Sequence, residues 1–269
     1  MDGSLNRDRP EVRLRAFRAI DEPDTCGLFI MGHTHVLTSI GVTKVTSSKN
    51  EWAKNPAAFV IIVESLDGKR VYGGARVHVA GGSSPLPIEE ATGALDPGIF
   101  NLVLDFARHG TGELCGLWNS REIAGYGIGS IFLIRAAVAI AHQVSIQSLF
   151  ALCAPYTVKP VEGVGMELES SIGNEGTFYY PKLDLVATTM ILKDVPTLNK
   201  ANEEDKSAIF KIRENLNVIR EETLRNKKIL IHYEIQIPGL ERWDLKETIL
   251  NAQKTFLKNK IDQKDPEFF

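Results

Sequence analysis

The chain has 269 residues, 43% of them hydrophobic and 24% charged, with a formal net charge of −3 at pH 7. This is the composition of a globular protein with one large domain or two modest ones, and it gives no reason to expect a nucleic-acid partner. The longest apolar stretch, residues 128–141, contains Arg135 and is too short to span a bilayer, so we expect no membrane partner. The first ten residues lack the apolar core of a secretory signal, and we expect a cytoplasmic protein.

The first part of the chain predicts a strand, a helical region and a hairpin. Residues 12–20 alternate apolar and basic side chains, which is the period of a strand with one solvent-facing side. The proline and the acids of residues 21–24 favour a helix start, and residues 26–40 are apolar enough for one or two helices. Residues 59–64 and 70–80 then predict two antiparallel strands.

The middle of the chain alternates helices with short buried strands. Residues 88–94 and 97–106 predict two short helices, and residues 113–119 predict the next strand. After a glycine-rich turn, residues 130–143 are apolar nearly all round, which is typical of a buried helix. Residues 149–153 predict another buried strand. The remaining elements of this region are a short helix over 154–161 and two strands over 166–170 and 183–192.

The character of the sequence changes after residue 194. Residues 201–225 are charged, with apolar side chains at roughly helical spacing, and predict one amphipathic helix. Residues 229–237 predict a strand and residues 245–257 a final helix. The chain therefore divides into a flexible N-terminus (1–11), a main domain (12–194) and a helix–strand–helix extension packed on the same domain (195–269). The order of elements predicts an α+β fold.

The glycine-rich turn at residues 124–129 has the layout of a phosphate-binding loop. A predicted strand leads into Gly125, Gly127 and Gly129, and a predicted helix follows directly. Glycines let the backbone turn sharply and let a ligand approach the main chain closely. The first amides of the helix then point towards an anion, which the helix dipole also favours.

Two common classes of phosphate-binding loop fit this turn poorly. A P-loop requires Lys followed by Ser or Thr after its last glycine, whereas Gly129 is followed by Ser130 and Ile131. A dinucleotide fingerprint requires the spacing GxGxxG and an acid at the end of the next strand. Here the spacing is GxGxG, and the predicted strand at 149–153 is followed by Ala154.

In this segment the chain resembles the GNAT superfamily of acyl-CoA N-acyltransferases. The pyrophosphate motif of that family is Arg or Gln, two residues, Gly, one residue, then Gly or Ala, after the fourth strand. Gly127 and Gly129 match the motif, whereas Ala124 departs from it because Arg or Gln is expected there. The resemblance implies a GNAT-like α+β fold, with a mixed, mostly antiparallel twisted sheet flanked by helices.

The resemblance also implies an acyl donor, either acetyl-CoA or another acyl-CoA, and no metal. The strand at 113–119 would pair with the pantetheine arm, and the loop amides would bind the pyrophosphate. Because Ala124 lacks the usual side chain, the amides of residues 126–130 would carry the phosphate contact almost alone. The implied donor-binding residues are Leu117, Trp118, Asn119, Gly125, Tyr126, Gly127, Ile128, Gly129 and Ser130.

Two side chains are candidates for catalysis. The family frequently uses a Glu of the fourth strand as a base, and Glu113 begins that strand here, sharing a face with Cys115 and Leu117 by alternation. The Tyr that usually protonates the departing thiolate is replaced by Val161. Tyr156, just after the fifth predicted strand, is therefore the candidate acid.

The remaining reactive side chains predict packing more readily than chemistry. Cys26, Cys115 and Cys153 are widely spaced, which favours buried thiols over a disulfide framework or a zinc site. An acyl-enzyme on Cys153 has no neighbouring base motif to support it. His33 and His35 alternate, but no further ligands follow them. In a GNAT-like protein this region lies over the acceptor site, so either histidine could contact substrate.

Three hypotheses for function follow. The leading one is an acyl-CoA-dependent N-acyltransferase, most simply an acetyltransferase, that acts on a small-molecule amine or amino acid. The second is a long-chain acyltransferase of the autoinducer or N-acyl amino acid synthase type that uses acyl-carrier protein, because residues 26–40 and 42–58 are longer than a minimal acceptor site needs. The third is a non-catalytic CoA-binding protein of the same fold. A homodimer contact through the extension is also allowed.

Overall fold

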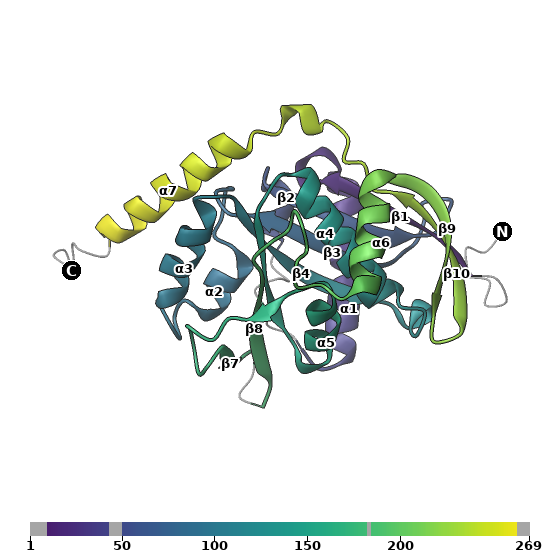
Figure 1. The fold of residues 1–269 in the computed structure, drawn as a ribbon, viewed down its shortest axis with the longest axis horizontal. Helices are drawn as coiled ribbons and strands as arrows, with labels where there is room; N and C mark the ends of the chain where they lie inside the picture. The colour runs from purple at the N-terminus through teal and green to yellow at the C-terminus, as the bar shows by residue number, and fades with distance from the viewer. Residues whose placement is uncertain (1–9, 43–49, 182–183, 263–269) are drawn as a thin grey trace.

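A single mixed sheet runs through the protein and carries helices on both faces (Figure 1). The computed structural model describes residues 10–42, 50–181 and 184–262. The strands are β1 (Glu11–Arg18), β2 (Ala58–Glu64), β3 (Val71–Val79), β4 (Thr111–Asn119), β5 (Ser148–Cys153), β6 (Glu167–Leu168), β7 (Thr177–Tyr179), β8 (Val186–Leu192), β9 (Asn217–Leu224) and β10 (Lys227–Glu234). Their spatial order is β6-β8-β5-β4-β3-β2-β1-β10-β9, with β7 paired to β8 beside this path.

The sheet is antiparallel except at two places. Strands β1 to β4 form an antiparallel series, and β5 pairs antiparallel with β8. The parallel pairs are β4 with β5 and β1 with β10. The predicted α+β class, with a mixed and mostly antiparallel sheet, is therefore confirmed.

The helices follow the predicted order closely. They are α1 (Pro23–Ser39), α2 (Pro87–Thr92), α3 (Gly98–Ala107), α4 (Leu133–Gln143), α5 (Pro155–Gly163), α6 (Glu203–Glu214) and α7 (Leu245–Asp262). Almost every side chain of α4 is buried, because the helix lies between the sheet and α6. Helix α5 continues through Pro160. Within the described ranges, no helix has the length and apolar character needed to cross a membrane.

The prediction of one helix over residues 201–225 is wrong. Helix α6 ends at Glu214, and the next residues form β9, which pairs antiparallel with β10. The turn between the strands places Arg225 and Asn226 at φ values of 49° and 67°, the left-handed geometry of a tight hairpin. Ile219, one of the apolar residues that fitted the helical spacing, is 58% exposed on β9, which is an edge strand of the sheet. The extension is thus helix–strand–strand–helix, and β10 joins the sheet beside β1.

Two predicted segments lie partly outside the described residues. The flexible N-terminus was predicted over 1–11, of which residues 1–9 are not described, and Glu11 already belongs to β1. The loop predicted over 42–58 includes residues 43–49, which are also not described. Its described part contains a short 3₁₀ turn, Glu51–Lys54, that buries Trp52 against the sheet.

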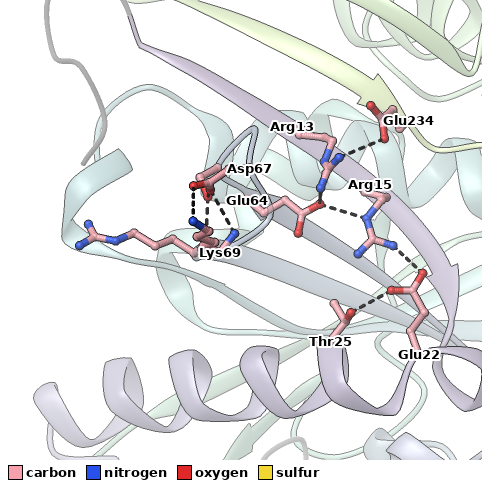
Figure 2. Close-up of polar contacts among 10 residues, drawn as sticks. Arg13, Arg15, Glu22, Thr25, Glu64, Asp67, Lys69 and Glu234 are labelled. Atoms are coloured by element: carbon pink, nitrogen blue, oxygen red, sulfur yellow. Dashed lines mark hydrogen bonds and ion pairs between the residues drawn. The ribbon is translucent and has the colours of Figure 1, made fainter. Parts of the chain in front are cut away.

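A network of ion pairs joins the first strands to the C-terminal extension (Figure 2). The Glu64 carboxylate accepts hydrogen bonds from Arg13 Nε at 2.7 Å and Arg15 Nε at 3.0 Å. Arg15 also pairs with Glu22 before α1, and Arg13 lies 3.9 Å from Glu234 at the end of β10. Glu64 is only 2% exposed, so its charge is stabilised by these guanidinium groups rather than by water.

We predict that Glu64→Gln lowers the free energy of unfolding by about 1–3 kcal/mol, because two guanidinium groups lose their shared anion. Urea denaturation at neutral pH measures this loss. The matched control is Glu221→Gln, which breaks the exposed pair with Lys228 and should cost within about 0.5 kcal/mol. Equal losses in the two variants would contradict a structural role for the Glu64 network.

Candidate active site

The central feature of the site is the divergence of β4 from β5. The two parallel strands pair only from Thr111 with Ser148 to Glu113 with Phe150. Beyond this point they separate, and a cavity of about 610 Å³ opens between them. The cavity is lined by the middle of β4, the end of β5, the first turn of α5, the C-terminal half of α1 and residues around the β7–β8 connection.

A β-bulge at Gly116 sets the faces of β4. Gly74 pairs with Trp118, but Arg76 pairs with Cys115, so β4 carries one extra residue at this point. Gly116 has a φ of +59°, and a Cβ there would lie 2.8 Å from Arg76 side-chain nitrogens. The bulge reverses the alternation beyond it. The expectation that Leu117 shares a face with Glu113 is therefore wrong: Leu117 packs with the large core cluster on the α4 side.

Glu113 lies in the cavity wall as a buried carboxyl group. It is 2% exposed, and its Oε2 accepts a hydrogen bond from the Ile88 amide at 2.7 Å. Burial raises the pKa of Glu113 to about 8, with the charge of Glu89 adding to the rise and Arg76 opposing it. At neutral pH the side chain is therefore largely protonated, and it becomes a carboxylate under mildly alkaline conditions.

Three polar side chains around Glu113 were not singled out in the sequence: Arg76 and His78, which are buried, and Glu89, which is half-buried. Arg76 stacks on Trp52, with its guanidinium carbon 4.2 Å from the ring centroid. His78 is the cross-strand partner of Glu113, and burial lowers its pKa well below the usual range. Glu89 lines a separate cavity of about 290 Å³ beside α3, and burial raises its pKa to about 7. An arginine and a histidine inside the apolar strand β3 were the signal that could have revealed this cluster.

Tyr156 and Cys153 both line the cavity, in different settings. Tyr156 is 77% exposed in the first turn of α5, at the mouth of the cavity. Cys153 is buried, and burial raises the pKa of its thiol to about 12. A neutral thiol is a poor nucleophile, so the arrangement disfavours an acyl-enzyme on Cys153.

Helix α1 contributes His33 to the cavity wall. His33 is 5% exposed and lies edge-on to Phe29, with ring centroids 5.9 Å apart. Burial, helped by the charge of Arg76, lowers the pKa of His33 to about 4, so the imidazole is neutral. Tyr180, from the β7–β8 connection, also lines the cavity and had no signal in the sequence.

The predicted donor-binding residues of β4 differ in where their side chains lie. Leu117 lines the cavity directly. The Trp118 side chain instead packs edge-on against Phe29 at 5.7 Å on the α1 side, so only its backbone could face a donor. Asn119 ends β4, and its side chain lies so close to Gly129 that a Cβ there would be 2.0 Å from Asn119 Cβ.

The glycine loop opens helix α4 through one π-helical turn, Ile128–Phe132. Gly125 and Gly127 have φ values of +85° and +78°, which favour glycine. Within the described part of the chain, the amides of Gly127, Ile128 and Gly129 donate to no acceptor. These amides are the type of donor set that binds a phosphate at a helix start. Packing also explains Gly127 and Gly129. A Cβ on Gly127 would lie 2.5 Å from Leu224, and a Cβ on Gly129 would lie against Asn119 as described above.

Comparison with known proteins identifies the fold. No protein-family model matches the chain, and no curated protein matches it in sequence. FeeM, an N-acyl amino acid synthase from uncultured soil microbes, superposes with a TM-score of 0.53 and 14% identity, covering 73% of this chain and 97% of FeeM. BjaI, a CoA-dependent acyl-homoserine lactone synthase solved with SAM and isopentyl-CoA, superposes with a TM-score of 0.52 and 11% identity, covering 90% and 99%.

The protein therefore has the GNAT fold that its glycine motif predicted. The splayed β4 and β5, the bulge in β4 and the glycine loop before α4 lie together in this fold, on the elements where the resemblance placed the donor site.

We predict that the Glu113 carboxyl titrates with a midpoint near pH 8, because burial disfavours its charged form. Carbon-13 NMR of side-chain carboxyl groups measures this midpoint, and Glu113→Gln assigns the signal by its loss. A Glu113 midpoint below pH 6 would show that the carboxyl group is hydrated.

Proposed function

We propose that the protein is an N-acyltransferase that transfers an acyl group from a CoA thioester to a small amine or amino acid. The observation that carries this proposal is the cavity between the diverging strands, which has the buried carboxyl group of Glu113 in its wall. The free edge of β4 can pair with an extended pantetheine arm, as a third strand would. Gly129 packs against Asn119, the last residue of β4, so the loop amides at residues 127–129 follow the strand where the pyrophosphate would lie.

The proposed reaction is a direct transfer. The amine nitrogen attacks the thioester carbonyl carbon, the C–N bond forms and the C–S bond breaks. Glu113, as a carboxylate, accepts the proton that the amine loses. The departing thiolate takes a proton from Tyr156 at the mouth of the cavity or from solvent. The neutral His33 and the apolar wall exclude water from the thioester, which limits hydrolysis.

We predict that Glu113→Gln lowers kcat by roughly 10²–10⁴-fold with little change in donor affinity, because the amide cannot accept the proton. Wild-type kcat should rise with pH through about 8, since only the deprotonated carboxyl group acts as a base, and the variant should lose this dependence. Thiol release from acyl-CoA, measured with a panel of amines, gives the rates.

Calorimetric titration with CoA supplies the complementary measurement. Donor binding without turnover on any amine would favour the non-catalytic alternative. The absence of CoA binding at millimolar concentration would refute both the enzyme proposal and the donor site.

The volume of the cavity favours a second candidate for the acyl group. About 610 Å³ is far more room than an acetyl group fills, and the lining includes Leu37, Ala151, Leu152 and Val186. The two solved structures of the same fold are named as synthases of an N-acyl amino acid and an acyl-homoserine lactone. Both observations support a longer acyl chain, delivered by CoA or by acyl-carrier protein.

We predict that kcat/KM increases from acetyl- to octanoyl-CoA, because each buried methylene contributes up to about 0.8 kcal/mol. A series of acyl-CoA chain lengths measures this trend. Ala151→Leu narrows the cavity and should shift the optimum to shorter chains, with activity on acetyl-CoA as the internal control. A preference for acetyl-CoA in the wild-type protein would contradict the long-chain proposal and favour the proposal of an acetyltransferase.

A further inference from the structure

The tip of the β9–β10 hairpin lies against the glycine loop, although about 100 residues of chain separate them. Leu224, the last residue of β9, covers Gly127 so closely that a Cβ there would lie 2.5 Å from Leu224 Cδ2. Lys227, the first residue of β10, places its Nζ 3.1 Å from where a Cβ on Gly125 would lie. The same ammonium group is 4.9 Å from the centroid of the Tyr126 ring.

The ammonium group of Lys227 brings a positive charge to this loop. In the described portion of the chain, no carboxylate lies within ion-pair distance of it. The next residue, Lys228, points to the other side of the hairpin by strand alternation and pairs with Glu221 at 2.7 Å. The one acid in the loop segment, Glu122, lies 3.7 Å from Arg70. Among the described residues, the charge of Lys227 is therefore not neutralised by an ion pair with a neighbouring acid.

The hairpin holds this charge in a defined place. Strand β10 pairs with β1 over five residues, from Glu11 with Leu230 to Arg15 with Glu234. Tyr233 donates a hydrogen bond to Glu222 at 3.0 Å across the hairpin. The ammonium group of Lys227 lies over the Tyr126 ring, which also favours its cation. Figure 1 shows the hairpin at the end of the sheet opposite β7 and β8, extending beyond β1.

The loop itself lacks a cationic side chain at the position where the GNAT motif has Arg or Gln. Ala124 occupies that position. The amides of Gly127, Ile128 and Gly129 can supply hydrogen bonds and a partial positive charge, but they cannot neutralise two phosphate charges. A fixed ammonium group on the flank of Gly125 and Tyr126 would complete such a site.

We propose that Lys227 supplies the cation that contacts the CoA pyrophosphate, in place of the side chain missing at Ala124. This inference rests on the proposed function, because it assumes that the loop binds a CoA donor. It gives the β9–β10 hairpin a role in donor binding, and it makes Lys227 a binding residue contributed from outside the segment that carries the glycine motif.

The test is calorimetric titration of the full chain with CoA and with dephospho-CoA, which keeps the pyrophosphate and lacks the 3′-phosphate. Lys227→Met removes the charge and keeps an unbranched side chain of similar length. It should raise the Kd for both ligands by roughly tenfold or more, the effect of losing one charge-assisted hydrogen bond. Lys227→Arg should restore affinity to within about threefold of the wild type. Increasing salt should weaken wild-type binding more steeply than binding by Lys227→Met.

The matched control is Lys228→Met, which removes an adjacent charge on the other side of the hairpin and should leave Kd within about twofold. Thermal unfolding of each variant checks that the hairpin remains folded. Unchanged CoA binding by Lys227→Met would overturn the inference alone. A loss seen with CoA but not with dephospho-CoA would also overturn it, because the contact would then be to the 3′-phosphate. No CoA binding by the wild type would overturn the proposed function and this inference with it.

Discussion

Strands β4 and β5 pair for three residues and then part, and the rest of the site depends on this divergence. Backbone amides and carbonyls on two facing strand edges need partners, and an open edge is a template for another extended chain. Helices α1 and α5 line the resulting cavity from either side. The bulge at Gly116 turns β4 at the same level and re-aims Leu117 and Trp118. The pantetheine arm of the proposed donor carries amides that would supply such partners.

The second theme of the structure is the burial of ionisable side chains on the α1 side of the sheet. Arg76, His78 and Glu113 all occupy positions that a half-buried sheet normally fills with apolar side chains. Their cost is offset locally: Arg76 stacks on Trp52, and Glu113 is held by the Ile88 amide. The consequence is a carboxyl group with a raised pKa beside an apolar cavity, which is the property that the base of the proposed reaction needs.

Sequence patterns predicted local elements well where the period was clear. The alternation of β1, the apolar helix α4 and the glycine turn were all visible in the chain, because each is encoded by neighbouring residues. The interpretation failed at residues 217–224, where Ile219 and Leu224 also fitted a helical stripe. Pairing with β10 decided that segment in favour of a strand, and pairing is a contact that periodicity does not report. The reversal of faces beyond Gly116 was missed for the same reason, since the extra residue is defined by the partner strand.

The sequence by itself determined the order of most elements and the position of the glycine loop, and through its resemblance it indicated the GNAT fold. It also placed Glu113 on the correct strand. Only the tertiary structure decided that Glu113 is buried, that the Trp118 side chain faces away from the cavity, and that β10 lies beside β1. It alone brought Lys227 to the loop formed by Gly125 and Tyr126. These features depend on contacts between residues far apart in the chain, and burial and pKa are properties of such contacts rather than of any one residue.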